Sequence, residues 1–263
     1  MTILPYERYR TEVAAQLASL RTTLDGADLS MTVPTCPDWT LDRLARHVGG
    51  AVRWVELHVR TRTTENIPDS EVPGFHGPEE GGAAALDAWL AETAEMFDAT
   101  LRGADADTPV WSWTGEATAG FWARRMTHEV AIHRADAALA VGVPYELAPE
   151  VAADAVDEWL DIVRFVQRVA ADERAVALRG DGRTLHLHAT DAGPELAAEW
   201  TITLGPDGVS WERRHTKADV ALRGPLTEVL LAFYRRRPVD SGRVEVLGDR
   251  ELLEFWLERA SFG

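Results

Sequence analysis

The stretch WARRMTHEVAIHRAD, residues 122–136, is the most informative part of this chain of 263 residues. It lies inside a predicted helix over residues 119–141, which ends before Gly142. Glu129 and His133 are four residues apart, so a helix places both side chains on one face, about one turn apart. A carboxylate and an imidazole at this spacing are suited to share one metal ion inside a helix bundle.

The helix does not supply a pair of histidine ligands in the way an HExxH motif does. His128 and His133 are five residues apart, about 140° around a helix, and are poorly placed to bind one ion. His47 is the better candidate, because its neighbours Leu44 and Val48 are apolar and its helix face should point inward. An inward histidine is also common as a hydrogen-bonded core residue, and a Glu/His pair is common on helix surfaces. The spacing alone therefore leaves the metal site open.

Gly49 and Gly50 follow His47 in the middle of the predicted helix, where each costs roughly 1 kcal/mol relative to alanine. Two explanations are open. Either something must approach the backbone beside His47, or the glycines permit close packing of two helices.

Along the rest of the chain, hydrophobic periodicity predicts a helical first part and a second part that contains both strands and helices. Further helices are expected at 6–25, 41–61, 84–102 and from Pro149 to about 171, with a long loop over one end of the bundle at 64–83. Strands are expected at 184–190, 199–204, 218–224 and 244–246, and helices at 225–235 and 249–260. The fold class is therefore a two-domain α+β protein: an antiparallel helix bundle over residues 1–171 and a small α+β domain over residues 172–263.

Composition excludes several classes of protein. Lys and Arg number 27 and Asp and Glu 43, a net charge of −16, which disfavours nucleic acid or an anionic membrane as the partner. The single cysteine, Cys36, excludes an internal disulfide. No apolar run approaches the roughly 20 residues that span a bilayer, and the first residues lack the apolar core of a signal peptide. We expect a cytoplasmic protein, with a monomer favoured and the oligomeric state otherwise open.

Other candidate sites are weaker. His186 and His188 lie two apart in a predicted strand and face one side, as two metal ligands can, but without a nearby Asp or Cys cluster a solvated strand face is the preferred interpretation. Cys36 precedes a helix, where its pKa could fall, although packing is the commoner role of a lone cysteine. The tryptophans in predicted loops, Trp39, Trp111 and Trp113, could line a pocket. No GxSxG, P-loop or dinucleotide-binding glycine pattern is present.

One motif is VPTCPDWTLDRLARHVGG, from residue 33, and a second is ARRMTHEVAIHRADAALAVG, from residue 123. Together they resemble the mycothiol-dependent maleylpyruvate isomerase family of actinobacteria, part of the wider DinB-like group of thiol-dependent metalloenzymes. The segment RRRPVDSGRVEVLGDRELL, residues 235–253, is similar to the family's small C-terminal domain. One departure is Asp38, where the family commonly has glycine, in a loop where we expect no effect on the metal.

The resemblance implies a DinB-like bundle that binds zinc, or another divalent metal, through His47, Glu129 and His133. It implies mycothiol as the thiol cosubstrate, ionised at the metal, and a small electrophilic, anionic substrate. Arg125 and Arg237 are then candidates to bind that substrate, and Asp136, three residues after His133, to orient the imidazole.

The reaction is either cis–trans isomerisation of a maleylpyruvate-like acid or thiol S-transfer, because both use the same ionised thiol. The competing class is a non-enzymatic regulatory or binding module stabilised by zinc. A structural zinc is closed by four protein ligands, whereas a catalytic one keeps an open position, and the sequence offers three convincing ligands.

Overall fold

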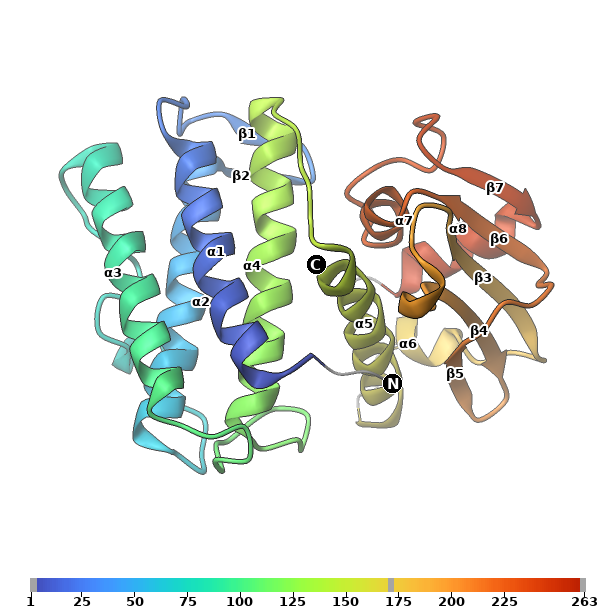
Figure 1. Ribbon diagram of the computed structural model, residues 1–263, viewed down its shortest axis with the longest axis horizontal. Helices are drawn as coiled ribbons and strands as arrows, with labels where there is room; N and C mark the ends of the chain where they lie inside the picture. Colours follow the sequence, from blue (N-terminus) through green and yellow to red (C-terminus); the bar gives the residue numbers. More distant parts are fainter. Residues whose placement is uncertain (1–3, 170–172, 261–263) are drawn as a thin grey trace. The chain divides into compact units, whose positions relative to one another are not determined.

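The computed structural model describes residues 4–169 and 173–260. Contacts divide the chain into two compact units, the first over residues 4–145 and the second over the described residues from 146 onward. The first unit is helical and the second contains a mixed β-sheet with helices, which is the α+β organisation expected from the sequence (Figure 1). Among the described residues, no helix combines the length and the apolar composition needed to cross a bilayer.

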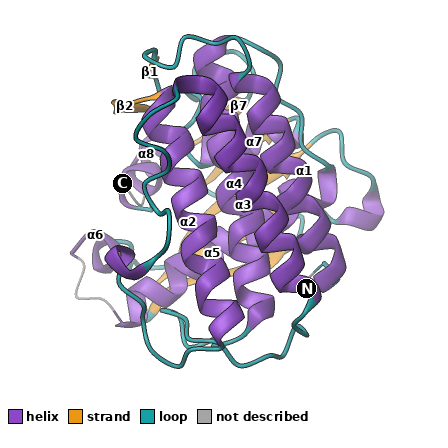
Figure 2. Cartoon of the chain, turned by 90° about the vertical axis from the view of Figure 1, so that its left-hand side faces the viewer, coloured by secondary structure: helices purple, strands orange, loops and turns teal. Residues whose placement is uncertain are grey.

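The first unit is a bundle of long helices. They are α1 (Tyr6–Leu24), α2 (Leu41–Thr61), α3 (Gly82–Arg102) and α4 (Ala119–Val141). The only strands in this unit, residues 4–145, form a short pair between α1 and α2, which is orange in Figure 2. The expected helix bundle is confirmed, and the ends of α2 and α4 agree with the ranges expected from the sequence.

Within the bundle, α2 and α3 are parallel. Arg53 Nε on α2 donates to Thr93 Oγ1 on α3 at 2.7 Å, and further along both helices Thr100 Oγ1 donates to Glu56 Oε1 at 2.8 Å. Residue numbers therefore rise together along the two helices. The connection between them must return over the length of a helix, roughly 30 Å for about 20 residues.

The connecting loop, residues 62–81, makes this return along the side of the bundle. Trp54 Nε1 donates to the carbonyl of Ile67, and Arg46 Nη1, two turns earlier on α2, donates to the carbonyl of His76, at 2.7 and 2.8 Å. A short 3₁₀ helix, η1 (Asp69–Glu71), lies within it. The sequence predicted a loop over one end of the bundle. The loop instead follows α2, because the helix that comes next is parallel to it.

The break between α1 and α2 is a short antiparallel strand pair, β1 (Thr32–Val33) and β2 (Cys36–Thr40). The prolines of the VPTCPDW stretch end the helical pattern here, as expected. Thr40 begins α2, and its hydroxyl accepts a hydrogen bond from the backbone N–H of Arg43 at 3.2 Å. This connection carries Thr35 and Trp39 to the end of α2 that lies beside α4.

Apolar side chains spaced three, four, seven or eight residues apart on each helix fill the bundle. Among those that are buried are Val13, Leu17, Leu20, Leu44, Val48, Val52, Leu86, Leu90, Phe97, Trp122 and Val130. Burying one such side chain contributes about 1.5–3 kcal/mol. The packed faces therefore fix how α2 and α4 are rotated, and with that the direction of the polar side chains between them.

The second unit combines a sheet with helices. Its elements are α5 (Pro149–Val169), α6 (Glu173–Ala177), β3 (Arg183–Ala189), η2 (Pro194–Leu196), β4 (Glu199–Gly205), β5 (Gly208–Arg213), β6 (Val220–Gly224), α7 (Leu226–Phe233), β7 (Glu245–Gly248) and α8 (Arg250–Arg259). The strand order is β5-β4-β3-β6-β7, with β3 and β6 parallel and the other neighbours antiparallel.

Helix α5 belongs to the second unit. Its Asp157 accepts a hydrogen bond from Trp200 Nε1 at 2.7 Å and pairs with Arg213 at 2.8 Å, both on the sheet. The Tyr234 hydroxyl donates to the carbonyl of Ala155 at 2.9 Å. The division after residue 145 therefore differs from the boundary at 171 expected from the sequence, because periodicity shows that a segment is helical but not which surface covers its apolar face.

Candidate metal centre

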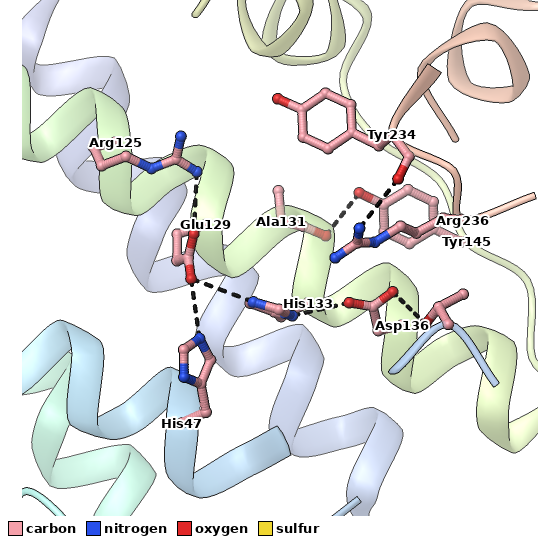
Figure 3. Close-up of polar contacts among 10 residues, drawn as sticks. His47, Arg125, Glu129, Ala131, His133, Asp136, Tyr145, Tyr234 and Arg236 are labelled. Atoms are coloured by element: carbon pink, nitrogen blue, oxygen red, sulfur yellow. Dashed lines mark hydrogen bonds and ion pairs between the residues drawn. The ribbon is translucent and has the colours of Figure 1, made fainter. Parts of the chain in front are cut away.

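Glu129 stands between two imidazoles in the bundle (Figure 3). Its Oε1 lies 3.1 Å from Nε2 of His47, on α2, and 3.3 Å from Nε2 of His133, one turn further along α4. One donor atom from each of the three residues lies within 4.8 Å of the others. The i,i+4 spacing and the inward face of α2 thus bring together the three residues selected from the sequence. Their role as metal ligands stays a prediction.

His128 points elsewhere. It is buried, and its ring packs edge-on against Tyr9 of α1 at a centroid distance of 6.3 Å. The adjacent Glu129 faces α2 instead, because consecutive residues lie about 100° apart on a helix. His128 therefore does not join Glu129 and His133 in one ligand set.

His133 is held by a buried carboxylate behind it. Nδ1 of His133 donates to Asp136 Oδ2 at 2.9 Å, and the hydroxyl of Thr35 donates to Asp136 Oδ1 at 2.6 Å. Asp136 is fully buried. With Nδ1–H engaged, Nε2 is the imidazole atom that faces Glu129 and His47. Asp136 thus lies where the sequence placed an orienting carboxylate, whereas Thr35, 101 residues away in the sequence, gave no signal.

The charges in this cluster depend strongly on one another. Burial alone would raise the pKa of Glu129, but hydrogen bonds from His133 and His47 and the charges of His133 and Arg125 hold it well below its usual range. Burial alone would lower the pKa of His133, but hydrogen bonds to Asp136 and Glu129 and their charges raise it to about 9. Glu129 is therefore ionised at neutral pH, and a cation binding here competes with the proton on His133.

The two candidate arginines occupy different surroundings. Arg125 lies one turn before Glu129 on α4, and its Nη2 is 3.2 Å from Glu129 Oε2, so it adds positive charge directly beside the cluster. Arg237 is in the second unit, where its Nε lies 2.7 Å from Glu228 Oε2. A role for either in binding substrate stays a prediction.

Trp39 is the aromatic residue beside the cluster. Its ring lies 4.7 Å from the ring of His47 and 5.8 Å from that of His133, measured between centroids. Trp111 instead packs against Trp54 and Trp122 in the bundle. Of the tryptophans that could line a pocket, Trp39 is the one placed to do so here.

Gly49 and Gly50 serve packing. A Cβ on Gly49 would lie 2.2 Å from ring atoms of Trp89 on α3, and one on Gly50 would lie 2.7 Å from the backbone oxygen of Phe75. Both glycines thus face the loop and α3. The structure favours the packing explanation over a ligand that approaches the backbone beside His47.

Cys36 lies in β2 and is half-buried against the apolar core of the bundle. It is not part of either group of candidate metal ligands found among the described residues. Its surroundings fit the packing role.

The comparisons with known proteins cover both units. A family model described as the mycothiol maleylpyruvate isomerase N-terminal domain matches residues 10–138, and one described as the MDMPI C-terminal domain matches residues 150–255. The chain belongs to the mycothiol-dependent maleylpyruvate isomerase family, as its motifs suggested.

Solved structures agree on the fold. The chain is similar to a crystal structure of a mycothiol-dependent maleylpyruvate isomerase, with 16% identity, a TM-score of 0.52, and coverage of 94% of this chain and 95% of the other. A histidine-to-alanine mutant of such an isomerase gives the same identity and coverage, with a TM-score of 0.50. No curated protein sequence matches the chain.

Proposed function

We propose that this protein is a metal-dependent enzyme that uses mycothiol as a low-molecular-weight thiol to attack a small electrophilic acid. Cis–trans isomerisation of a maleylpyruvate-like acid is the first candidate reaction, because the matching family and the similar solved structures carry that name. Thiol S-transfer is the variant that needs the same activated thiol but ends at a different product.

The observation that carries the proposal is the number and type of ligands in the bundle. Two imidazoles and one carboxylate are a donor set that zinc binds in catalytic sites, which keep a further position for water or substrate. The side chains of His47 and Glu129 are 37% and 23% exposed, so the cluster is reached from solvent. A zinc ion held there would lower the pKa of an entering thiol and so supply the nucleophile near neutral pH.

Three neighbouring residues orient these side chains or balance their charge. Asp136 keeps the Nδ1 proton on His133, so that Nε2 faces the cluster as a lone-pair donor. Thr35 fixes the second oxygen of Asp136. Arg125 balances the negative charge of Glu129, and we propose it as a cation that binds an anionic substrate.

A purely structural role for this cluster is disfavoured by the same count. A zinc that holds helices together is closed by four protein ligands. Among the described residues, the group contains His47, Glu129 and His133 and no fourth His, Cys, Asp or Glu. The ligand count thus favours an enzyme over a non-enzymatic zinc-stabilised module.

Turnover of maleylpyruvate to fumarylpyruvate, with and without added mycothiol, tests the proposal. Wild-type protein loaded with zinc should need the thiol, and Glu129→Gln should lose turnover together with the zinc held by His47, Glu129 and His133. Cys36→Ser is the control, and it should keep both. If mycothiol is consumed in a stable adduct with an electrophile and no fumarylpyruvate forms, the reaction is S-transfer. Full turnover without any thiol would contradict the proposal.

A further inference from the structure

A second cluster of histidines lies on the sheet of the second unit. His186 and His188 are two apart on β3, so both point to one face. The antiparallel register places His188 opposite Glu199 at the start of β4. The sequence favoured a solvated strand face here, because no Asp or Cys cluster lay nearby along the chain. Strand pairing supplies that partner from 11 residues further on.

The cluster lies on the face of the sheet turned away from α5. Trp200, next to Glu199, donates through Nε1 to Asp157 of α5, so its side chain points towards that helix. Successive side chains of a strand alternate, and Glu199 therefore points to the opposite face. His215, just after the edge strand β5, reaches the same carboxylate.

All three imidazoles converge on one oxygen atom. Oε2 of Glu199 lies 3.0 Å from Nε2 of His186, 3.0 Å from Nδ1 of His188 and 2.5 Å from Nδ1 of His215. The four donor atoms lie within 4.8 Å of one another. A carboxylate oxygen offers about two lone pairs, so three imidazole donors on one oxygen exceed what it can accept in good geometry. A shared cation explains the convergence better than three hydrogen bonds.

The surroundings of His186 suit metal binding. It is only 5% exposed. Burial lowers its pKa against the opposing effect of Glu199, which favours the neutral imidazole, the form that binds metal. For Glu199, burial would raise the pKa, but the hydrogen bond from His215 and the three imidazoles outweigh it and lower the pKa, so the carboxylate stays ionised.

We propose that His186, His188, Glu199 and His215 hold a divalent transition-metal ion, zinc by preference. Imidazole and carboxylate donors are ligands of zinc, and neighbouring ligand atoms in a tetrahedral zinc site are roughly 3.3 Å apart, close to the spacing around Glu199 Oε2. Four protein ligands make a closed, structural site. The ion ties β3 to β4 and to the segment that follows the edge strand.

This site lies in the second unit and has four candidate ligands, whereas the cluster in the bundle lies in the first unit and has three. The three-ligand cluster is left open for chemistry, whereas the four-ligand cluster has no position left for a substrate. Loss of the sheet ion should therefore weaken the second unit and leave zinc binding by the bundle unchanged.

Zinc alone, added to metal-stripped full-length protein, tests the proposal in a Glu129→Gln background, where a ligand of the bundle cluster is missing. This variant should still bind about one zinc per chain. Adding His188→Ala and His215→Ala should abolish that binding. His76→Ala in the same background is the matched control, because His76 is an exposed histidine outside both clusters, and it should leave binding unchanged.

Thermal unfolding gives a second readout. The side chain of His215 is 71% exposed, so His215→Ala should fold normally. Zinc should raise the Tm of the Glu129→Gln protein, since a ligand that binds only the folded state stabilises it, and the added His215→Ala should reduce this shift. The proposal is overturned if Glu129→Gln binds no zinc. It is also overturned if the protein that lacks His188 and His215 keeps the ion.

Discussion

Asp136→Asn removes the negative charge beside His133 but keeps the shape of the side chain, so it separates the effect of the charge on zinc binding from that of the hydrogen bonds. Asparagine has nearly the same shape as aspartate. Its amide oxygen can accept the Nδ1 proton of His133, and its NH₂ group can donate to the hydroxyl oxygen of Thr35, which is able to accept. The two contacts, now 2.9 and 2.6 Å, are therefore kept while the negative charge is removed.

We expect the Asp136→Asn protein to fold normally and to bind zinc with lower affinity. Replacing a group that orients a metal-ligating histidine typically costs about 10- to 100-fold in metal affinity, or about 1.4–2.8 kcal/mol. Asp136 is fully buried, which places the expected loss towards the upper end. Thr35→Val removes one hydrogen bond to the carboxylate but leaves the charge, so it should weaken zinc binding less than Asp136→Asn does.

Competition with a chromogenic chelator measures these affinities in wild type, in both single variants and in the double variant. The experiment uses a background that carries His188→Ala and His215→Ala, so that zinc in the sheet does not obscure the result. Both substitutions alter the same hydrogen bond between Thr35 and Asp136, so their effects on zinc affinity should be less than additive in the double variant. Wild-type zinc affinity in a well-folded Asp136→Asn protein would refute the idea that this carboxylate tunes a metal ligand.

Three further outcomes are expected. Gly49→Ala should destabilise the protein to urea by up to about 2 kcal/mol, because overpacking against Trp89 costs about 1–3 kcal/mol and the gain in helix propensity returns about 1 kcal/mol; a more stable variant would contradict the packing explanation. Burial lowers the pKa of His58 against an opposing hydrogen bond to a backbone carbonyl, so its NMR titration midpoint should lie below 6.5. Since the unfolded chain then takes up this proton first, His58 should make the protein less stable as the pH falls through 6.5. Cys36→Ser should leave zinc content unchanged, and loss of zinc in this variant would place the thiol in the site.

The helices could be predicted from the sequence because their signals are local. The range 119–141 follows from an apolar face and from Gly142, which adopts the left-handed conformation at the helix end. Thr40 marks the start of α2 by the same kind of local chemistry. Glu129 and His133 share a face for a purely geometric reason, and His47 was selected from the polarity of its neighbours.

The features that could not be predicted from the sequence depend on contacts between segments that are distant along the chain. Thr35 meets Asp136 only because the strand pair before α2 lies beside α4. The parallel arrangement of α2 and α3 leaves no mark in either helix, so the path of the loop between them could not be foreseen. Glu199 joins His188 through strand register, and periodicity defines which face a strand residue occupies but not which residue it meets.

The two clusters show how the same residue types can serve different ends. In the bundle, packed helices present three candidate ligands, and His133 donates to the buried carboxylate of Asp136. On the sheet, β3 supplies two imidazoles and β4 supplies a carboxylate. His215, just after the edge strand β5, completes the set. An edge strand is held by pairing on one side only, so a ligand just after β5 fastens the part of the sheet with the fewest backbone hydrogen bonds. The position of each cluster agrees with the role proposed for it: the three-residue set leaves a position open between packed helices, and the four-residue set lies where an ion would add a crosslink.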